Sequence, residues 1–145
     1  MSALVLSVCV RPATYGLGVF ACRQIRRRET VGRVRGNVVH DAAYGSPYCI
    51  DLGDGRRLEP DEPFRCLNHS CQPNCELLDL TPGDASRNQY DLFVKALRPI
   101  AAGEELTIDY AWSAEAAIVC GCRAANCRGW IVAAEQLPRV LEHNS

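Results

Sequence analysis

The sequence lacks the long apolar runs and the leader features that mark membrane and exported proteins. No stretch approaches the roughly 20 apolar residues that a bilayer-crossing helix needs. Residues 1–10 carry no basic region ahead of their apolar positions, as a secretory leader would. Nine cysteines in 145 residues are too few, and odd in number, for a disulfide-stapled secreted domain. We therefore expect an intracellular protein outside the membrane, with reduced thiols.

Lysine is almost absent too, since Lys95 is the only one among 16 basic residues. The formal net charge is −1, so the molecule as a whole does not attract nucleic acid. Six arginines nevertheless gather between Arg23 and Arg35. A run of like charge is most often a solvated face, but it can also contact phosphates, so both interpretations stay open.

The composition, 48% apolar and 23% charged, is that of a single folded domain without repeats or linkers. Short apolar and β-branched segments bounded by turn residues predict strands at residues 3–10, 17–21, 38–39, 48–52, 89–97 and 105–108. Pro12 is expected to end the first strand, and the stretch 52–63 is predicted to form turns. Only 131–142 has helical character, which Pro138 limits. The predicted fold class is mainly β.

The segment from Asn68 to Cys75 is the first candidate site. Adjacent Asn68 and His69 supply an amide and an imidazole that can contact a polar ligand. Pro73 and Asn74 predict an abrupt turn of the chain. A purely structural turn, with a hydrogen-bonded histidine, explains the same residues.

A second segment begins with a turn at Gly103 and ends in Asp109 and Tyr110. The turn predicts a strand whose end can hold a tyrosyl hydroxyl at the floor of a pocket. Taken alone, this pattern is also typical of an ordinary turn and strand.

The third candidate is a cysteine cluster near the C-terminus, formed by Cys120, Cys122 and Cys127. Structural zinc needs four ligands, so this cluster must recruit one more from elsewhere in the chain. Cys71 and Cys75 are both candidates. A redox role is less favoured, because no Cys-x-x-Cys motif lies in a βαβ pattern.

Together these residues resemble the SET-domain protein lysine methyltransferases. The matching motifs occur in the family's order over Thr14–Trp130: Gly16–Ala21, Arg65–Asn74, Gly103–Tyr110 and Cys120–Trp130. The resemblance implies several small β-sheets with a pseudo-knot, in which the Asn68-His69 segment and the segment ending in Tyr110 pass each other. It also implies a SET domain at 1–112, a post-SET zinc segment at 113–131 and a C-terminal tail at 132–145 that can form a short helix.

The resemblance further implies the cofactors and their ligands. S-adenosylmethionine would contact the residues at the family's cofactor positions: Gly16, Leu17, Tyr48, Arg65, Asn68, His69 and Trp130. A structural Zn²⁺ would be held by Cys71, Cys120, Cys122 and Cys127, with Cys75 outside the pattern. Tyr110 would orient the amine of the substrate lysine, whose neutral form an apolar channel favours.

Two positions depart from the family pattern and bear on the product. Val34 stands where the family commonly has a tyrosine, so one wall of the lysine channel loses a hydroxyl, unless Tyr44 or Tyr48 replaces it. Ile108 stands where a phenylalanine or tyrosine tunes the degree of methylation in relatives. Val34 therefore bears on whether the site is fully active. Ile108 has no hydroxyl to hold a channel water and leaves space for a methylated amine, which predicts di- or trimethylation.

The expected substrate is a lysine in a basic protein tail, which five acidic residues would attract: Asp51, Asp54, Glu59, Asp61 and Glu62. Nucleic acid is expected to be an indirect partner at most. Two alternatives remain, a catalytically weak SET protein that binds basic peptides and a zinc-dependent nucleic-acid-binding module that uses the arginines. The expected location is the cytoplasm in a bacterium and the nucleus or chromosome in a eukaryote.

Overall fold

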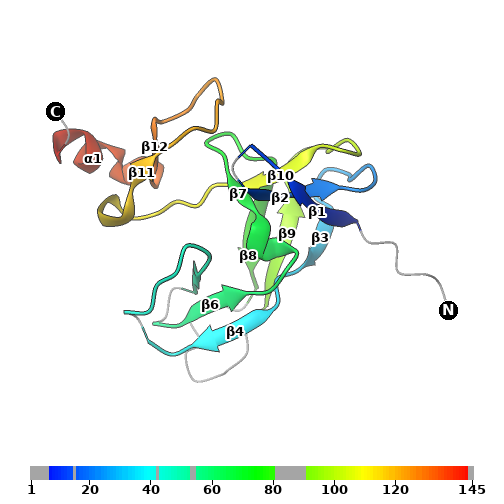
Figure 1. Cartoon of the computed structure of the whole chain (residues 1–145), viewed down its shortest axis with the longest axis horizontal. Helices are drawn as coiled ribbons and strands as arrows, with labels where there is room; N and C mark the ends of the chain where they lie inside the picture. Colours follow the sequence, from blue (N-terminus) through cyan, green and yellow to red (C-terminus); the bar gives the residue numbers. More distant parts are fainter. Residues whose placement is uncertain (1–6, 15, 42, 53–54, 81–90, 144–145) are drawn as a thin grey trace.

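The structure is a computed structural model that describes residues 7–14, 16–41, 43–52, 55–80 and 91–143. Its described part contains twelve short strands in four small sheets, three 3-10 helices and one short α-helix. Figure 1 shows most of the strands together in one body, with the C-terminal segment extending to one side. The prediction of a mainly β fold of several small sheets is confirmed.

The first sheet brings together residues that are far apart in the sequence. Its order is β1 (Val8–Pro12), β2 (Leu17–Ala21), β10 (Glu105–Ile108) and β7 (Asn68–His69). The pair β10–β7 is parallel, and Ile108 lies opposite His69. This pairing places Tyr110, two residues after β10 ends, beside the Asn68-His69 segment. That proximity is the condition on which the predicted active site depends.

Two further sheets complete the core. One has the order β3 (Thr30–Arg33), β9 (Leu92–Ala96) and β8 (Cys75–Asp79), and the other has the order β4 (Gly36–Val39), β6 (Arg57–Pro60) and β5 (Ile50–Asp51). Alternate residues of β9 point into the core, as a half-buried strand requires. Residues with no exposed surface include Val19, Ile25, Leu58, Val94 and Leu106.

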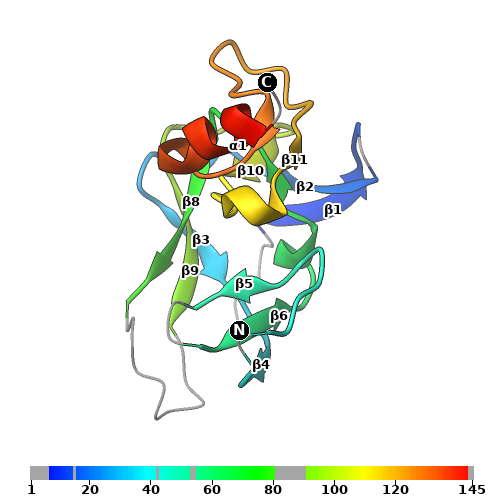
Figure 2. The same ribbon diagram turned by 90° about the vertical axis from the view of Figure 1, so that its left-hand side faces the viewer.

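The C-terminal segment folds back toward the loop that follows β10 (Figure 2). It contains the hairpin of β11 (Ile118–Val119) and β12 (Trp130–Ile131), and then helix α1 (Leu137–His143). The 3-10 helices are Phe64–Cys66, Ala114–Ala116 and Ala134–Gln136. The Ala133 N–H donates to the Trp112 carbonyl at 2.8 Å, and the Ala114 N–H donates to Gln136 Oε1 at 2.7 Å. The residues after 131 therefore pack on the loop after β10.

Several predicted element boundaries were wrong. β1 continues past the predicted end at residue 10 and ends at Pro12, which a strand can contain here because β1 is the edge strand of its sheet. Pro138 does not limit the helix but lies in its first turn, where a missing N–H costs nothing. The stretch predicted as turns contains β6, and the 3-10 helix that starts at Phe64 lies just beyond it. Residues 3–6 and 89–90 of two predicted strands lie outside the described residues.

Among the described residues, no helix is long and apolar enough to cross a membrane.

Candidate active site and four-cysteine cluster

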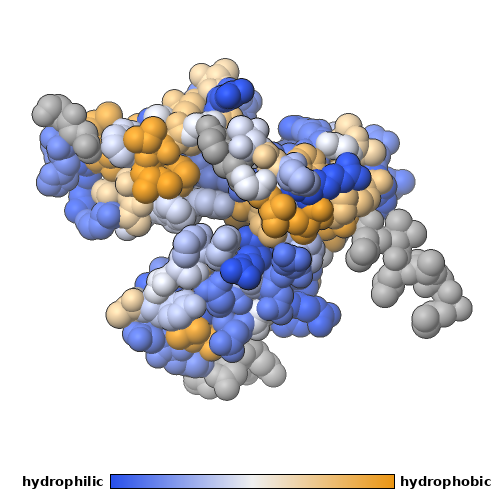
Figure 3. Space-filling view, viewed as in Figure 1, coloured by the Kyte–Doolittle hydropathy of each residue, from blue (hydrophilic) through white to orange (hydrophobic). Residues whose placement is uncertain are grey.

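A cavity of about 800 Å³ lies between the β4–β6–β5 sheet and the loop after β10. The surface is hollowed between these two parts of the molecule in Figure 3. Five of the predicted site residues line the cavity, namely Val34, Tyr48, Arg65, Ile108 and Tyr110. The lining is mainly apolar, but it includes five charged side chains, those of Asp51, Arg57, Arg65, Asp79 and Asp109. A concave, mainly apolar lining with placed polar groups is typical of small ligand sites.

Tyr110 is fixed in this cavity from two directions. Its backbone N–H donates to His69 Nδ1 at 3.0 Å, and its hydroxyl donates to the Leu67 carbonyl oxygen. Burial, with smaller contributions from Glu105 and Tyr48, raises the pKa of Tyr110 to about 12. The phenol is therefore neutral at physiological pH. Because its proton points to Leu67, its oxygen is left as an acceptor for a guest in the cavity.

His69 is buried, with 2% of its side chain exposed. Its Nδ1 accepts the Tyr110 N–H, so this nitrogen carries no proton. Burial lowers the pKa of His69, and this effect outweighs the opposing charge of Asp109, 3.7 Å away. The ring is thus neutral and acts as a structural acceptor for the Tyr110 backbone.

The other predicted cofactor residues form a second group beside the β2–β10–β7 edge. Asn68 Nδ2 donates to the Leu17 carbonyl at 3.0 Å and to Glu105 Oε2 at 2.8 Å. Gly16 has φ +72°, which favours glycine, and a Cβ there would meet open space. The Leu17 side chain is 49% exposed. The main chain at Gly16 and Leu17 is therefore open to a ligand, and its position is set by Asn68.

Tyr48 and Arg65 belong to the cavity and contact each other. The Arg65 guanidinium lies 4.2 Å from the centre of the Tyr48 ring, which is a cation–π contact. Of the two tyrosines considered as substitutes for the hydroxyl missing at Val34, Tyr48 lines the cavity, whereas Tyr44 bonds Glu59 at 2.8 Å. Val34 has no exposed surface.

Two tryptophans lie differently with respect to the cavity. Trp130, a predicted cofactor residue, is half-buried in β12 opposite Val119 and is not among the described residues that line the cavity. Trp112 was not predicted, yet it lines the cavity and stacks on Tyr110 with ring centres 5.2 Å apart. An aromatic residue two positions after Tyr110 was the signal that could have identified it.

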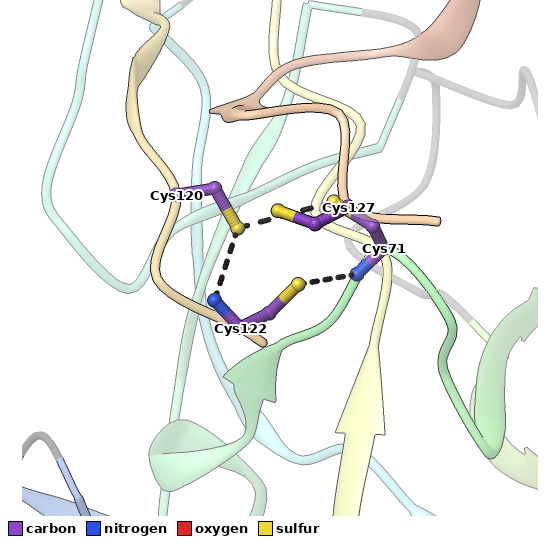
Figure 4. Close-up of side chains that lie close together, drawn as sticks. All are labelled: Cys71, Cys120, Cys122 and Cys127. Atoms are coloured by element: carbon purple, nitrogen blue, oxygen red, sulfur yellow. Dashed lines mark hydrogen bonds between the residues drawn. The ribbon is translucent and has the colours of Figure 1, made fainter. Parts of the chain in front are cut away.

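The four predicted zinc ligands converge at one point (Figure 4), although Cys71 is 49 residues from the nearest of the others. Their sulfur atoms all lie within 4.8 Å of one another, and Cys71 Sγ and Cys120 Sγ are 3.9 Å apart. Zn–S bonds of about 2.3 Å in a tetrahedron require sulfur–sulfur distances of roughly 3.8 Å. The observed separations fit this requirement.

The backbone around the cluster also suits thiolate ligands. Each of the four sulfur atoms accepts a backbone N–H at 3.4–3.5 Å; the donors are the amides of Cys71, Cys122, Arg128 and Gly129. Such donors stabilise negative sulfur. Cys75, the other candidate, has no exposed surface in the core, and burial raises its pKa to about 12. The cluster could hold Zn²⁺, with Cys71 as the fourth ligand.

Arginines in the run from Arg23 to Arg35 do not share one role. Arg23 is engaged with Glu29 through two side-chain hydrogen bonds, and Arg33 lies 3.8 Å from Asp91. Arg26, Arg27 and Arg28 are exposed. The run is therefore partly an internal ion-pair arrangement and partly a solvated face.

Comparison with known proteins defines the class of this fold and site. Residues 16–111 match the SET domain family, and this span is more than half of the chain. The chain therefore belongs to the SET domain family, as its motifs predicted.

The relatives are longer proteins. The chain is 28% identical over 140 residues to "Histone-lysine N-methyltransferase, H3 lysine-4 specific" of Chaetomium globosum, covering 83% of this chain and 13% of that protein. It is 38% identical over 92 residues to histone-lysine N-methyltransferase ash1 of Drosophila melanogaster, covering 58% of this chain and 4% of that protein. The chain thus spans 13% or less of the length of these relatives.

A solved structure shares the fold. The crystal structure of KRYPTONITE in complex with mCHH DNA, H3(1-15) peptide and SAH superposes with a TM-score of 0.73 at 23% identity. The superposition covers 90% of this chain and 30% of that one. This likeness extends the shared fold beyond the residues that match the family.

Proposed function

We propose that this chain is a protein-lysine N-methyltransferase that uses S-adenosylmethionine and acts on a histone or another basic protein. The observation that carries the proposal is the neutral Tyr110 hydroxyl, held inside an apolar cavity directly beside the Asn68-His69 segment of a SET domain. The names of the relatives, and the SAH and H3 peptide in the KRYPTONITE complex, support the same activity, cofactor and substrate class.

The proposed cofactor site consists of Gly16, Leu17, Asn68 and His69, with Tyr48 and Arg65 toward the cavity. The left-handed, open main chain at Gly16 supports close approach of a ligand. Trp130 is proposed to close over the cofactor or the lysine channel. When bound, S-adenosylmethionine supplies an activated methyl group. The protein has to align the lysine amine with this methyl group, and holding the two reactants in that geometry accelerates the reaction.

The cavity itself supplies the remaining requirements. Lysine is protonated in water, with a pKa of about 10.4, and the ammonium ion has no lone pair. Apolar walls such as Val34, Leu67 and Ile108 disfavour the charged form. The Tyr110 oxygen then accepts an N–H from the neutral amine and so fixes the direction of its lone pair. With its pKa raised to about 12, Tyr110 orients the amine rather than removing its proton.

The product is proposed to be di- or trimethyl-lysine. Neither Val34 nor Ile108 has a hydroxyl that could anchor a water molecule in the channel. An unanchored water is displaced more easily by a methyl group. Mass spectrometry of a modified substrate peptide tests this proposal, and exclusively monomethylated product contradicts it.

The proposed substrate is a basic tail, and Asp51 and Asp79 support it by adding carboxylates to the cavity lining. Acidic residues of this region also have internal partners, since Asp51 lies 2.8 Å from the Arg57 guanidinium and Glu59 accepts hydrogen bonds from Tyr44 and Ser46. Asp54 lies outside the described residues. We assign the chain to chromatin in a eukaryotic host, in keeping with its fungal and insect relatives, and to the cytoplasm in a bacterial host.

We also propose the division of the chain into a SET domain at 1–112, a post-SET zinc segment at 113–131 and a C-terminal segment at 132–145. The family match ending at residue 111 supports the first boundary. Three of the four cysteines of the cluster fall in the second part. The third part contains α1.

The test is transfer of labelled methyl from S-adenosylmethionine to histones by the purified protein. Tyr110→Phe removes the cavity hydroxyl and is expected to lower transfer by roughly 100-fold or more, as loss of one preorganised hydrogen-bonding group does. Tyr44→Phe is the matched control, because its hydroxyl bonds Glu59 outside the cavity lining, and it should retain activity.

Each other outcome decides between the alternatives. Binding of cofactor and basic peptide without methyl transfer supports the alternative of a catalytically weak SET protein that binds peptides. That alternative remains because Val34 stands where the family commonly has a tyrosine. Steeply salt-dependent binding to DNA or RNA, without cofactor binding, supports the nucleic-acid-binding module.

A further inference from the structure

The side chain of Arg128 connects the cysteine cluster to the loop that carries Tyr110. Its Nη2 donates to Asp109 Oδ1 at 2.8 Å, and only 15% of the side chain is exposed. Arg128 directly follows Cys127, and its own backbone N–H donates to Cys71 Sγ at 3.4 Å. One residue therefore contacts both the proposed zinc site and the loop after β10.

Asp109 uses the same oxygen to hold the backbone on the other side of Tyr110. Asp109 Oδ1 accepts the Ala111 N–H at 2.9 Å. Ala111 has φ +50°, a left-handed conformation that crowds the Cβ of an alanine and is unfavourable without external support. The Asp109 carboxylate supplies that support, and the Arg128 guanidinium fixes the carboxylate.

The left-handed conformation of Ala111 affects both of its neighbours in the chain, and both neighbours line the cavity. Before Ala111 stands Tyr110, whose backbone N–H is held by His69. After it stands Trp112, which stacks on the Tyr110 ring. If Ala111 relaxed to an ordinary backbone conformation, the chain would turn differently between these two aromatic residues. The Tyr110 hydroxyl would then lose its fixed position at Leu67.

The position of the Arg128 side chain that allows its bond to Asp109 is energetically unfavourable for another part of the guanidinium. Its Nε is buried and has no hydrogen-bond partner among the described residues. Buried polar groups without partners are uncommon and unfavourable. An aliphatic residue would avoid the cost, so the guanidinium is retained for what its other end does.

We infer that Arg128 is a positioning residue that acts through Asp109 to hold Ala111 left-handed, and so couples the integrity of the cysteine cluster to the position of Tyr110. This inference rests on the proposed function only in the catalytic role given to Tyr110. Its test therefore requires neither substrate nor methyl transfer.

The experiment is amide hydrogen exchange by NMR on the zinc-loaded protein, with zinc content measured for each variant. Arg128→Met keeps the aliphatic stem but removes the guanidinium. We expect the Tyr110 and Ala111 amides to exchange roughly tenfold faster or more, while zinc stays bound and the core strands stay protected. Arg123→Met is the matched control, because Arg123 is an exposed arginine in the same loop.

A second substitution separates positioning from a general structural role. Ala111→Gly removes the crowding at φ +50° and should restore slow exchange to the Arg128→Met protein. Rescue by a glycine at this one position supports the inference. Unchanged exchange in Arg128→Met, or faster exchange without rescue, overturns it.

If Arg128→Met fails to fold or loses zinc, Asp109→Asn gives the same decision without altering the cysteine loop. Faster exchange at Ala111, rescued by Ala111→Gly, supports the inference. Exchange that is unaffected by Asp109→Asn overturns it. If methyl transfer is never found but these exchange results hold, the positioning role stands and only the proposed function fails.

Discussion

Replacing Asn74 with alanine should destabilise the protein strongly, because its side-chain amide hydrogen-bonds to the backbone of β10 as a neighbouring strand would. Asn74 is 3% exposed and sits one residue before β8. Its Nδ2 donates to the Glu105 carbonyl at 2.8 Å, and its Oδ1 accepts the Thr107 N–H at 2.8 Å. These are alternate backbone groups of β10, the strand that leads to Tyr110.

The size of the effect follows from these two bonds. Alanine removes both partners and leaves one buried carbonyl and one buried N–H on β10 without them. An unsatisfied backbone group costs about 1–3 kcal/mol. Because Glu105 and Thr107 are only half-buried, water can reach them in part, so the lower half of that range applies to each. We expect a loss of roughly 2–4 kcal/mol in the free energy of unfolding.

Urea denaturation followed by circular dichroism measures this loss through the midpoint and slope of the transition. Asn37→Ala is the matched control, since Asn37 is exposed in β4, and it should change stability by less than about 0.5 kcal/mol. A loss no larger than the control's in Asn74→Ala would mean that the Asn74 amide does not hold β10, and the reasoning would be refuted.

Three other perturbations have definite expected outcomes. Gly36→Ala puts a Cβ 2.2 Å from the Glu59 carbonyl oxygen and should cost about 1–3 kcal/mol in thermal unfolding, unlike Gly45→Ala, which meets open space. Cys122→Ser should bind far less than one zinc per chain by metal analysis. Tyr110, whose folded pKa of about 12 exceeds its unfolded value of about 10, favours folding fully below pH 10 and loses this contribution as pH rises toward 12. The stability difference from Tyr110→Phe should therefore stay constant from about pH 7 to pH 10 and shrink above it; a difference that stays constant up to about pH 12 contradicts the raised pKa.

Local chemistry made part of the fold predictable. β2 and β10 each follow a glycine turn, and β10 alternates between half-buried and buried residues, so their bounds were found from the sequence at 17–21 and 105–108. Gly103, with φ +89°, supplies the turn before β10. The cysteine spacing likewise identified three members of the cluster.

Other elements depend on partners that the sequence does not reveal. β6 contains Arg57, Glu59 and Pro60, which resemble a loop, but it is the central strand between β4 and β5. β3 lies in the arginine run and is held by β9, whose paired residues are 60 to 65 positions away. In both cases the strand forms because its neighbours provide hydrogen bonds and burial, which outweigh the low strand propensity of its residues.

The choice between Cys71 and Cys75 shows the same limit within one motif. The two residues are four positions apart, and spacing to the C-terminal cysteines does not distinguish them. Packing does, because Cys75 begins β8 and belongs to the hydrophobic core, whereas Cys71, although also buried, lies in the turn before it and contacts the C-terminal loop. The same turn orients Asn74 toward β10, a role that was predicted only as turn formation.

The position of Tyr110 depends on both halves of the cysteine cluster. His69, which holds the Tyr110 N–H, lies two residues before Cys71, and Arg128, which fixes Asp109, lies directly after Cys127. A metal ion that joins Cys71 to Cys127 would therefore close a ring around the loop after β10, with one support on each side of Tyr110. Each support alone is a single hydrogen bond or ion pair, which contributes little when its donor is free to move. Joined through a metal ion in the cluster, the two supports would lose less entropy on forming, which would explain why the four-cysteine cluster lies so close to a residue proposed for catalysis.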